Sequence, residues 1–179
     1  MARKIEILPY NPTWVEDYRE EITRLSGIVG VNLVAAHHIG STAVPGLAAK
    51  PTLDILWVVR DLETLDACND AMSELGYTAK GENGIPGRRY FQRVEDEQHL
   101  AHIHAFNEGH PEITRMLNFR DYLIAHPQTA NEYEALKQQL AVQFRDVPMK
   151  YTQGKEEFIR AVDKRAAAWR SSMDHEIGK

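Results

Sequence analysis

One carboxylate lies inside a run of apolar residues, where acidic side chains are uncommon. Asp54 stands near the start of 53–59, whose composition predicts a buried strand. An unpaired carboxylate is costly to bury, so an aspartate at such a position is usually paired, hydrogen-bonded or bound to a metal. Asp54 is therefore the first candidate for chemistry.

A Gly-Ser pair precedes this strand and follows another apolar run, 31–39, which predicts a second buried strand. The backbone of Gly40 can bring chain amides close to a ligand. Turn amides suit phosphate, and Ser41 and Thr42 add hydroxyl groups. A carboxylate on the next strand is then placed to hold a metal that neutralises the phosphate. The plain alternative is a tight turn, with an aspartate that caps a neighbouring loop.

Two histidines are the second candidate. His102 and His104 alternate within the apolar run 100–106, and alternate residues of a strand point to one face. Adjacent imidazoles can bind a divalent metal, contact phosphate or act as acid and base. If this strand neighbours that of Asp54, the three side chains converge. The alternative is a pair of solvent-facing histidines on an exposed sheet face.

Three cationic side chains could neutralise a bound phosphate. Lys50 lies in the loop between the first two strands, Arg89 follows the glycine-rich loop 81–87, and Lys155 follows Gly154. The alternatives are a solvated surface arginine and the start of a helix with ordinary packing. Gly154 interrupts a helical pattern, and its missing side chain could admit another segment.

These residues need a sheet to bring them together. Besides the strands above, 4–8 is predicted as an edge strand, and 89–94 with 100–106 as a hairpin joined by an acidic turn. Helical spacing predicts one helix from Pro12 to about residue 26 and another over 62–75.

The pattern is helical from residue 110 onward. Apolar faces over 113–123, 133–144 and 151–169 predict three helices, and Pro111 and Pro127 suit first helical positions. The expected architecture is therefore α+β, with a mixed β-sheet flanked by helices and a helical C-terminal third.

Composition fits a single domain. The 179 residues are 43% hydrophobic and 26% charged, enough to bury a sizeable core. We assign residues 1–170 to this domain, with its helical part over about 110–170, and expect the polar tail 171–179 to be disordered. Cys68, the single cysteine, is expected to be a core residue.

Charge and hydropathy exclude two classes. The net charge is -5, without a long Lys/Arg run, so bulk nucleic-acid binding is not expected. No apolar run reaches the length of a membrane span, and no signal-peptide core is present, so we expect no membrane association and a cytoplasmic location.

Four sequence motifs resemble those of a known family. The run from His38 to Ile55, HIGSTAVPGLAAKPTLDI, resembles the signature of the GrpB family. HIHAF from His102, FRDYL from Phe119 and YTQGK from Tyr151 are similar to its later motifs, in the same order. The resemblance covers about 5–168 and implies a nucleotidyltransferase-like fold of the polymerase-beta-type superfamily. Some relatives are fused to dephospho-CoA kinase, which implies a nucleotide or coenzyme A context.

The superfamily pattern is Gly-Ser, a loop, Asp-x-Asp or Asp-x-Glu, and a third carboxylate on a later strand. Gly40, Ser41 and Asp54 match, Leu56 stands at the second carboxylate position, and the histidine pair stands where a third might be sought. Two-metal catalysis needs several carboxylates. Either Asp54 and a histidine hold one metal, or the site binds a nucleotide without transferring it.

Three hypotheses follow. The leading one is a nucleotidyltransferase that moves a nucleotidyl group from a nucleoside triphosphate to a small-molecule acceptor. Ser41 and the turn amides would hold phosphates, and Asp54, His102 and His104 would serve as catalytic groups and as ligands of Mg²⁺ or Mn²⁺. The second is a non-catalytic nucleotide- or coenzyme A-related binding module, and the third is a histidine-based metal-dependent phosphohydrolase. All three require these side chains to share one site. The acceptor and the oligomeric state stay open.

Overall fold

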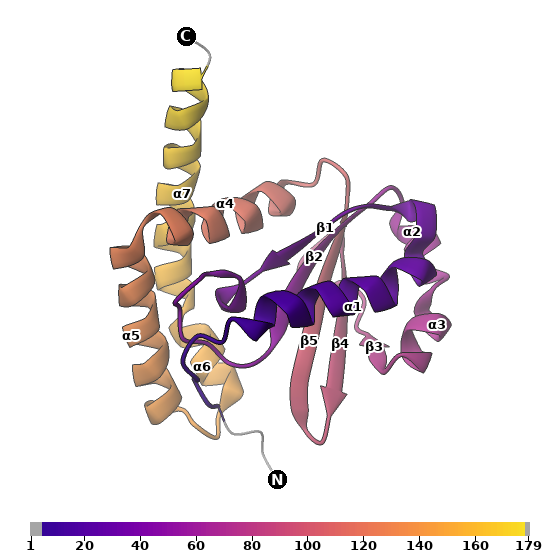
Figure 1. Ribbon diagram of the computed structural model, residues 1–179, viewed down its shortest axis with the longest axis horizontal. Helices are drawn as coiled ribbons and strands as arrows, with labels where there is room; N and C mark the ends of the chain where they lie inside the picture. The colour runs from indigo at the N-terminus through magenta and orange to yellow at the C-terminus, as the bar shows by residue number, and fades with distance from the viewer. Residues whose placement is uncertain (1–4, 178–179) are drawn as a thin grey trace.

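A five-stranded mixed sheet lies at the centre of the computed structural model, which describes residues 5–177 (Figure 1). The strand order is β1-β2-β5-β4-β3; β2 and β5 are parallel and all other neighbours are antiparallel. The strands are β1 (Leu33–Ile39), β2 (Leu53–Val59), β3 (Tyr77–Ala79), β4 (Arg88–Glu95) and β5 (Gln98–Asn107). The predicted mixed sheet and the β4–β5 hairpin are confirmed.

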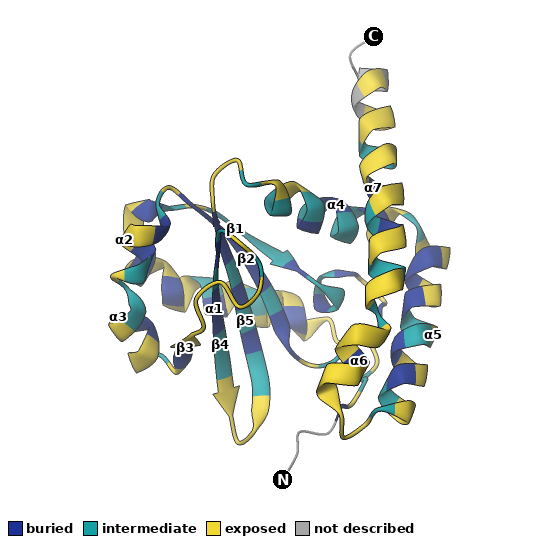
Figure 2. Cartoon of the chain, turned by 180° about the vertical axis from the view of Figure 1, so that it is seen from behind, coloured by how far each residue is buried: buried dark blue, intermediate teal, exposed yellow. Residues whose placement is uncertain are grey.

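One face of the sheet packs on α1 (Thr13–Val29), α2 (Leu62–Asp66) and α3 (Asn69–Glu74). Alternation along β2 turns Ile55, Trp57 and Val59 to this face, where they join the main hydrophobic cluster with Leu25 of α1. Figure 2 shows buried positions running along β2 and β5. Burial on both sides explains why β2 reads as a nearly continuous apolar run.

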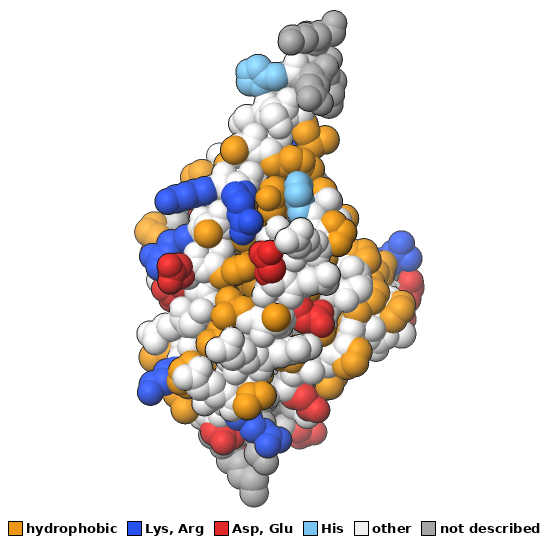
Figure 3. All heavy atoms as spheres, turned by 90° about the vertical axis from the view of Figure 1, so that its left-hand side faces the viewer, with side chains coloured by type: hydrophobic (Ala, Val, Ile, Leu, Met, Phe, Trp, Pro, Cys, Tyr) orange, Lys and Arg blue, Asp and Glu red, His pale blue; other side chains and the backbone are white. Residues whose placement is uncertain are grey.

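The C-terminal helices are α4 (Pro111–Ala125), α5 (Pro127–Gln143), α6 (Pro148–Gly154) and α7 (Glu156–Ile177). They form a group beside the sheet, and α4 packs against its opposite face (Figures 1 and 2). Met116 of α4 packs against Leu56 and Phe106 of the sheet. The outer side of these helices mixes basic, acidic and apolar side chains (Figure 3). The chain is therefore α+β with a helical C-terminal region, as the sequence predicts.

Three of these helices begin at a proline, because the fixed φ of proline suits the first helical turn. Gly154 divides the third predicted helix into α6 and α7. A Cβ atom at this position would lie 2.6 Å from Cδ2 of Leu140, so α6 approaches α5 this closely only because residue 154 lacks a side chain. The close approach expected at Gly154 is thus present.

Three sequence-based expectations are corrected. The edge strand predicted over 4–8 is absent from residues 5–8. Leu8 makes only an isolated bridge to Ala49 in the loop before β2, and a single bridge does not extend into a strand. Residue 4 lies outside the described part. The helix expected over 62–75 is two short helices, with Cys68 between them and partly buried against the main core.

The third correction concerns the tail. Residues 171–177 continue α7, and the hydroxyls of Ser171 and Ser172 donate to carbonyls of the preceding turn. No glycine or proline stands in this stretch to stop the helix; residues 178–179 are not described. None of the described helices combines the length and apolar composition of a bilayer span.

Candidate functional site

A pocket of about 340 Å³ lies between the sheet and the C-terminal helices. It brings together eight of the nine residues that the sequence singles out, and Arg89 is the exception. The eight are Gly40, Ser41, Thr42, Lys50, Asp54, His102, His104 and Lys155. One site therefore gathers side chains from β2, β5, the turn after β1 and the α6–α7 junction.

The turn after β1 packs directly against the carboxylate of Asp54. Gly40 has φ 72° and ψ -172°, a conformation that is essentially restricted to glycine. A Cβ atom on Gly40 would lie 2.6 Å from Oδ2 and 2.9 Å from Cβ of Asp54. The glycine is required here because only a bare backbone can approach the strand so closely.

His38 contacts this turn through Thr42. Its Nε2 lies 2.9 Å from Oγ1 of Thr42, and its ring stacks on Tyr18 with a centroid distance of 4.9 Å. Burial lowers the pKa of His38 to about 4. The ring is therefore neutral near pH 7 and orients Thr42 without adding charge to the pocket.

Two imidazoles contact one oxygen of Asp54. The register of β2 and β5 places Asp54 beside His102, whose Nδ1 lies 3.2 Å from Oδ1. Nε2 of His104 lies 3.6 Å from the same oxygen. Burial alone would raise the pKa of Asp54, but the two imidazoles outweigh it and hold that pKa well below its usual range. Asp54 is an ionised hydrogen-bond acceptor.

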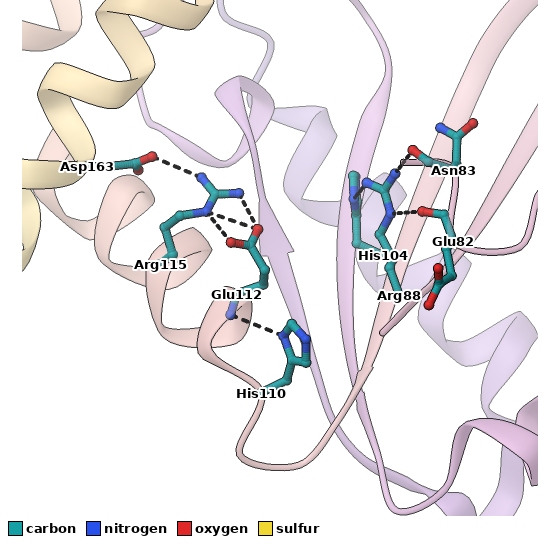
Figure 4. A network of polar contacts seen from close by, with 8 residues as sticks. All are labelled: Glu82, Asn83, Arg88, His104, His110, Glu112, Arg115 and Asp163. Atoms are coloured by element: carbon teal, nitrogen blue, oxygen red, sulfur yellow. Dashed lines mark hydrogen bonds and ion pairs between the residues drawn. The ribbon is translucent and has the colours of Figure 1, made fainter. Parts of the chain in front are cut away.

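Arg88 decides the protonation of His104. A guanidinium can only donate, so Nδ1 of His104, 3.2 Å from Nη1 of Arg88, must accept (Figure 4). The proton of a neutral His104 then sits on Nε2, which faces Asp54. Burial lowers the pKa of His104, which favours this neutral form. Arg88 also donates to the carbonyls of Glu82 and Asn83 at 3.0 and 2.7 Å, which ties the glycine-rich loop to the sheet.

The predicted metal set does not fit this arrangement. A metal at Asp54 would have to displace the proton from the nitrogen that faces Asp54 in His102 and in His104, and would break both contacts with the carboxylate. The second nitrogen of each ring faces protein: Nε2 of His102 lies 2.7 Å from Nδ1 of His99, and Nδ1 of His104 faces Arg88. Across residues 5–177 no group of three or more His, Cys, Asp or Glu side chains could hold a metal ion. The two histidines act instead as donors toward Asp54.

Leu56 fills the place of the second carboxylate with core packing. Its side chain is fully buried against Ile39, Phe106 and Met116. Asp54 is the one acidic residue among the described residues that line the pocket. The site therefore lacks the several carboxylates that two-metal catalysis requires.

Three lysines line the same pocket as the single carboxylate. The ammonium groups of Lys50 and Lys155 lie 5.1 and 4.6 Å from the ring centroid of Tyr151. That of Lys137 lies 4.9 Å from the ring of Tyr133. Cations over aromatic faces are held by the ring electrons, so the pocket has a wall rich in lysine with an aromatic lining.

The sequence and one solved structure then identify the family. A family model described as GrpB protein matches residues 4–165. The chain belongs to the GrpB family.

Relatives of this GrpB chain cover it almost entirely. It is 46% identical to UPF0157 protein YqkA of Bacillus subtilis over 98% of this chain and 51% of that protein, so it spans about half the length of this relative. The crystal structure of conserved protein GrpB from Enterococcus faecalis aligns with a TM-score of 0.86 at 38% identity, over 90% of this chain and 96% of that one. A dephospho-CoA kinase of Mycolicibacterium paratuberculosis is 26% identical over 94% of this chain and 47% of that protein.

Arg89 lies outside the site of this GrpB chain. Neighbouring residues of β4 point to opposite faces, so Arg88 faces His104 whereas Arg89 faces α2. There its Nε and Nη2 bind the carboxylate of Asp66 at 2.6 and 2.8 Å. Arg88 is the arginine that contacts a pocket residue, His104, and it does not line the pocket itself.

Lys137 was missed at the sequence level, although a signal was present. Tyr133, Lys137 and Leu140 repeat at i, i+4 and i+7 and therefore share one face of α5. All three are buried. A lysine within the apolar stripe of a helix is unusual, because lysine is rarely fully buried without a partner.

Proposed function

We propose that this chain binds the phosphates of a nucleotide or of a coenzyme A-type ligand in the pocket. One observation carries the proposal: Lys50, Lys137 and Lys155 line a pocket whose single acidic residue is Asp54. Burying like charges together is costly, and a phosphate group would offset that cost. Burial lowers the pKa of Lys155, against the opposing effect of Asp54, which indicates how poorly the pocket solvates a cation.

The aromatic lining suits the rest of such a ligand. Tyr90, Phe119, Tyr133 and Tyr151 line the pocket together with the lysines. Flat π-faces stack on nucleobases of any identity, with about 1–3 kcal/mol for each base. The turn at Gly40 and Ser41 adds backbone amides and a hydroxyl at the same wall.

Nucleotidyl transfer is the second candidate. The observation that favours it is the ionised carboxylate of Asp54, which faces the Gly40–Ser41 turn. The lack of further carboxylates beside Asp54 favours binding without transfer. A metal-dependent phosphohydrolase that uses His102 and His104 as ligands is not favoured, because no group of three or more His, Cys, Asp or Glu side chains within residues 5–177 could hold a metal ion.

Thermal unfolding with a panel of ligands tests the proposal. The panel holds nucleoside mono-, di- and triphosphates, and coenzyme A compounds because one relative is named dephospho-CoA kinase. A ligand at about 100 times its Kd stabilises by roughly 2.7 kcal/mol, which raises the Tm of a domain of this size by about 5–11 °C. Each ligand is measured with and without Mg²⁺.

Matched variants place the ligand. Lys155→Ala should abolish the shift, whereas Lys150→Ala removes an exposed lysine of α6 beside the pocket and should leave it unchanged. Equal shifts in the two variants, or no shift with any phosphorylated compound, would refute the proposal. Release of pyrophosphate from a triphosphate with Mg²⁺ would establish the second candidate instead.

A further inference from the structure

Lys137 reaches the pocket from α5 and is the least solvent-exposed of its lysines. Its residue is 2% exposed, whereas Lys50 and Lys155 are half-buried. Its Nζ donates to the carbonyl of Ala48, which is its one hydrogen bond within the described structure. One turn earlier on α5, Glu134 accepts from the amide of Ala48 at 2.7 Å. The helix thus holds both backbone groups of one residue in the loop before β2.

A clamp on this loop does not require an ammonium. A neutral donor such as a glutamine amide could hold the carbonyl of Ala48 without the desolvation penalty of a buried charge. The ammonium has three donors, one of which goes to Ala48. Lys137 also lines the pocket itself. These features indicate a second task that needs a cation at this depth.

We propose that Lys137 is the innermost phosphate-binding group of the pocket and that it takes up a proton as the anion binds. This inference rests on the proposed function, since it names the group that the ligand's phosphates would meet at the base of the site. The bond to Ala48 aims the side chain into the pocket, and the approaching anion supplies the countercharge that the free protein lacks.

The charges around Lys137 come from every neighbouring element. Burial has the largest effect on its pKa, Lys155 at the α6–α7 junction and Lys50 before β2 lower it further, and Glu134 on α5 raises it; together they bring the pKa to about 7. Burial raises the pKa of Tyr133, so its hydroxyl adds no charge at this pH. A bound anion opposes the two lysines and therefore raises the pKa of Lys137.

Proton uptake by Lys137 on ligand binding should depend on pH. With a pKa of about 7, Lys137 of the free protein is about nine-tenths neutral at pH 8 and about nine-tenths charged at pH 6. Because the bound form keeps the proton, binding at pH 8 takes up about 0.9 proton and binding at pH 6 about 0.1. A buried cation that merely supports the loop would show no such dependence on ligand.

Isothermal titration with inorganic tripolyphosphate measures this uptake. The binding heat is recorded at pH 6, 7 and 8 in buffer pairs of different ionisation enthalpy. Lys137→Arg keeps a charge that cannot be removed, so its titration reports the protons that belong to the tripolyphosphate and to other groups. We expect wild type to exceed Lys137→Arg by close to one proton at pH 8 and by little at pH 6. Lys137→Met should weaken binding at pH 6 by about tenfold or more.

Glu134→Leu is the matched control for the clamp, because leucine has no acceptor for the amide of Ala48. It breaks the other half of the contact with Ala48 but keeps Lys137, and it removes the carboxylate that raises the pKa of that lysine. We therefore expect binding to persist, with more proton uptake at pH 7 than in wild type. Equal losses of affinity in Glu134→Leu and Lys137→Met would show that Lys137 acts only through the loop.

Two results for wild type keep the inference falsifiable even if a variant fails to fold. Binding whose proton count at pH 6 and pH 8 is fully accounted for by the ionisation of tripolyphosphate itself would overturn the role of Lys137 while leaving the proposed function intact. Absence of binding to tripolyphosphate, nucleotides and coenzyme A compounds alike would overturn both.

Discussion

Replacing Gly40 with alanine should destabilise the fold through Asp54. The added Cβ atom would lie 2.6 Å from Oδ2 and 2.9 Å from Cβ of that residue. The second contact matters more, because Cβ of Asp54 is attached to the backbone of a central strand and cannot rotate away. Relief therefore requires the turn or β2 itself to shift.

Two effects set the magnitude. A non-glycine residue in the backbone conformation of Gly40 costs about 1–3 kcal/mol, and overpacking a well-ordered contact costs roughly another 1–3 kcal/mol. We expect a loss of about 4 kcal/mol in the free energy of unfolding. For a domain of this size that lowers the Tm by about 8–16 °C.

Gly46→Ala is the matched control. Gly46 also has a positive φ, 81°, yet its added Cβ would meet nothing within 4 Å. Urea unfolding of the two variants should therefore distinguish the cost of the backbone conformation, which both variants share, from the cost of the contact with Asp54. Gly40→Ala should be less stable than Gly46→Ala by about 1–3 kcal/mol. Equal losses in the two variants would refute the argument that Gly40 is required by its contact with Asp54.

Three further outcomes are expected. Gly154→Ala should lower the free energy of unfolding by about 1–2 kcal/mol, since its Cβ meets a movable methyl group of Leu140. A double-mutant cycle with Leu140→Ala should show that the two substitutions are coupled. Additive losses of stability would contradict the contact. Burial lowers the pKa of His38 from 6.5 to about 4. The unfolded state therefore binds the proton first, and the free energy of unfolding falls as the pH drops from 6.5 to 4. Denaturant melts of His38→Gln should show a shallower decline with pH, and an unchanged decline would argue against this assignment. Nitrogen-15 NMR should find the proton of His104 on Nε2 in wild type and a changed tautomer balance in Arg88→Gln, whereas a protonated Nδ1 in wild type would exclude acceptance from Arg88.

Local pattern was sufficient for the central elements and for half of the site. The apolar runs of β1 and β2 and the alternation of His102 and His104 are properties of neighbouring residues, because a strand repeats every two positions. The turn at Gly40 was equally visible, since glycine marks positions where the backbone needs freedom.

Register and burial required the folded chain. The choice between Arg88 and Arg89 depends on which face of β4 meets β5, and a shift of one residue would exchange them. The role of the histidines also came from the fold, because Arg88 and Asp54 fix which ring nitrogens carry protons. Without those partners the pair reads equally well as metal ligands.

The sequence by itself determined an α+β chain of the GrpB type with Asp54 beside a Gly-Ser turn, because these features follow from the order of neighbouring residues. The tertiary structure alone decided what surrounds that carboxylate. Lys137 lies more than eighty residues further along the chain than Asp54 and reaches the pocket only because α5 packs against the loop before β2. Its charge depends on burial and on distant lysines, and both arise only when segments remote in sequence pack together.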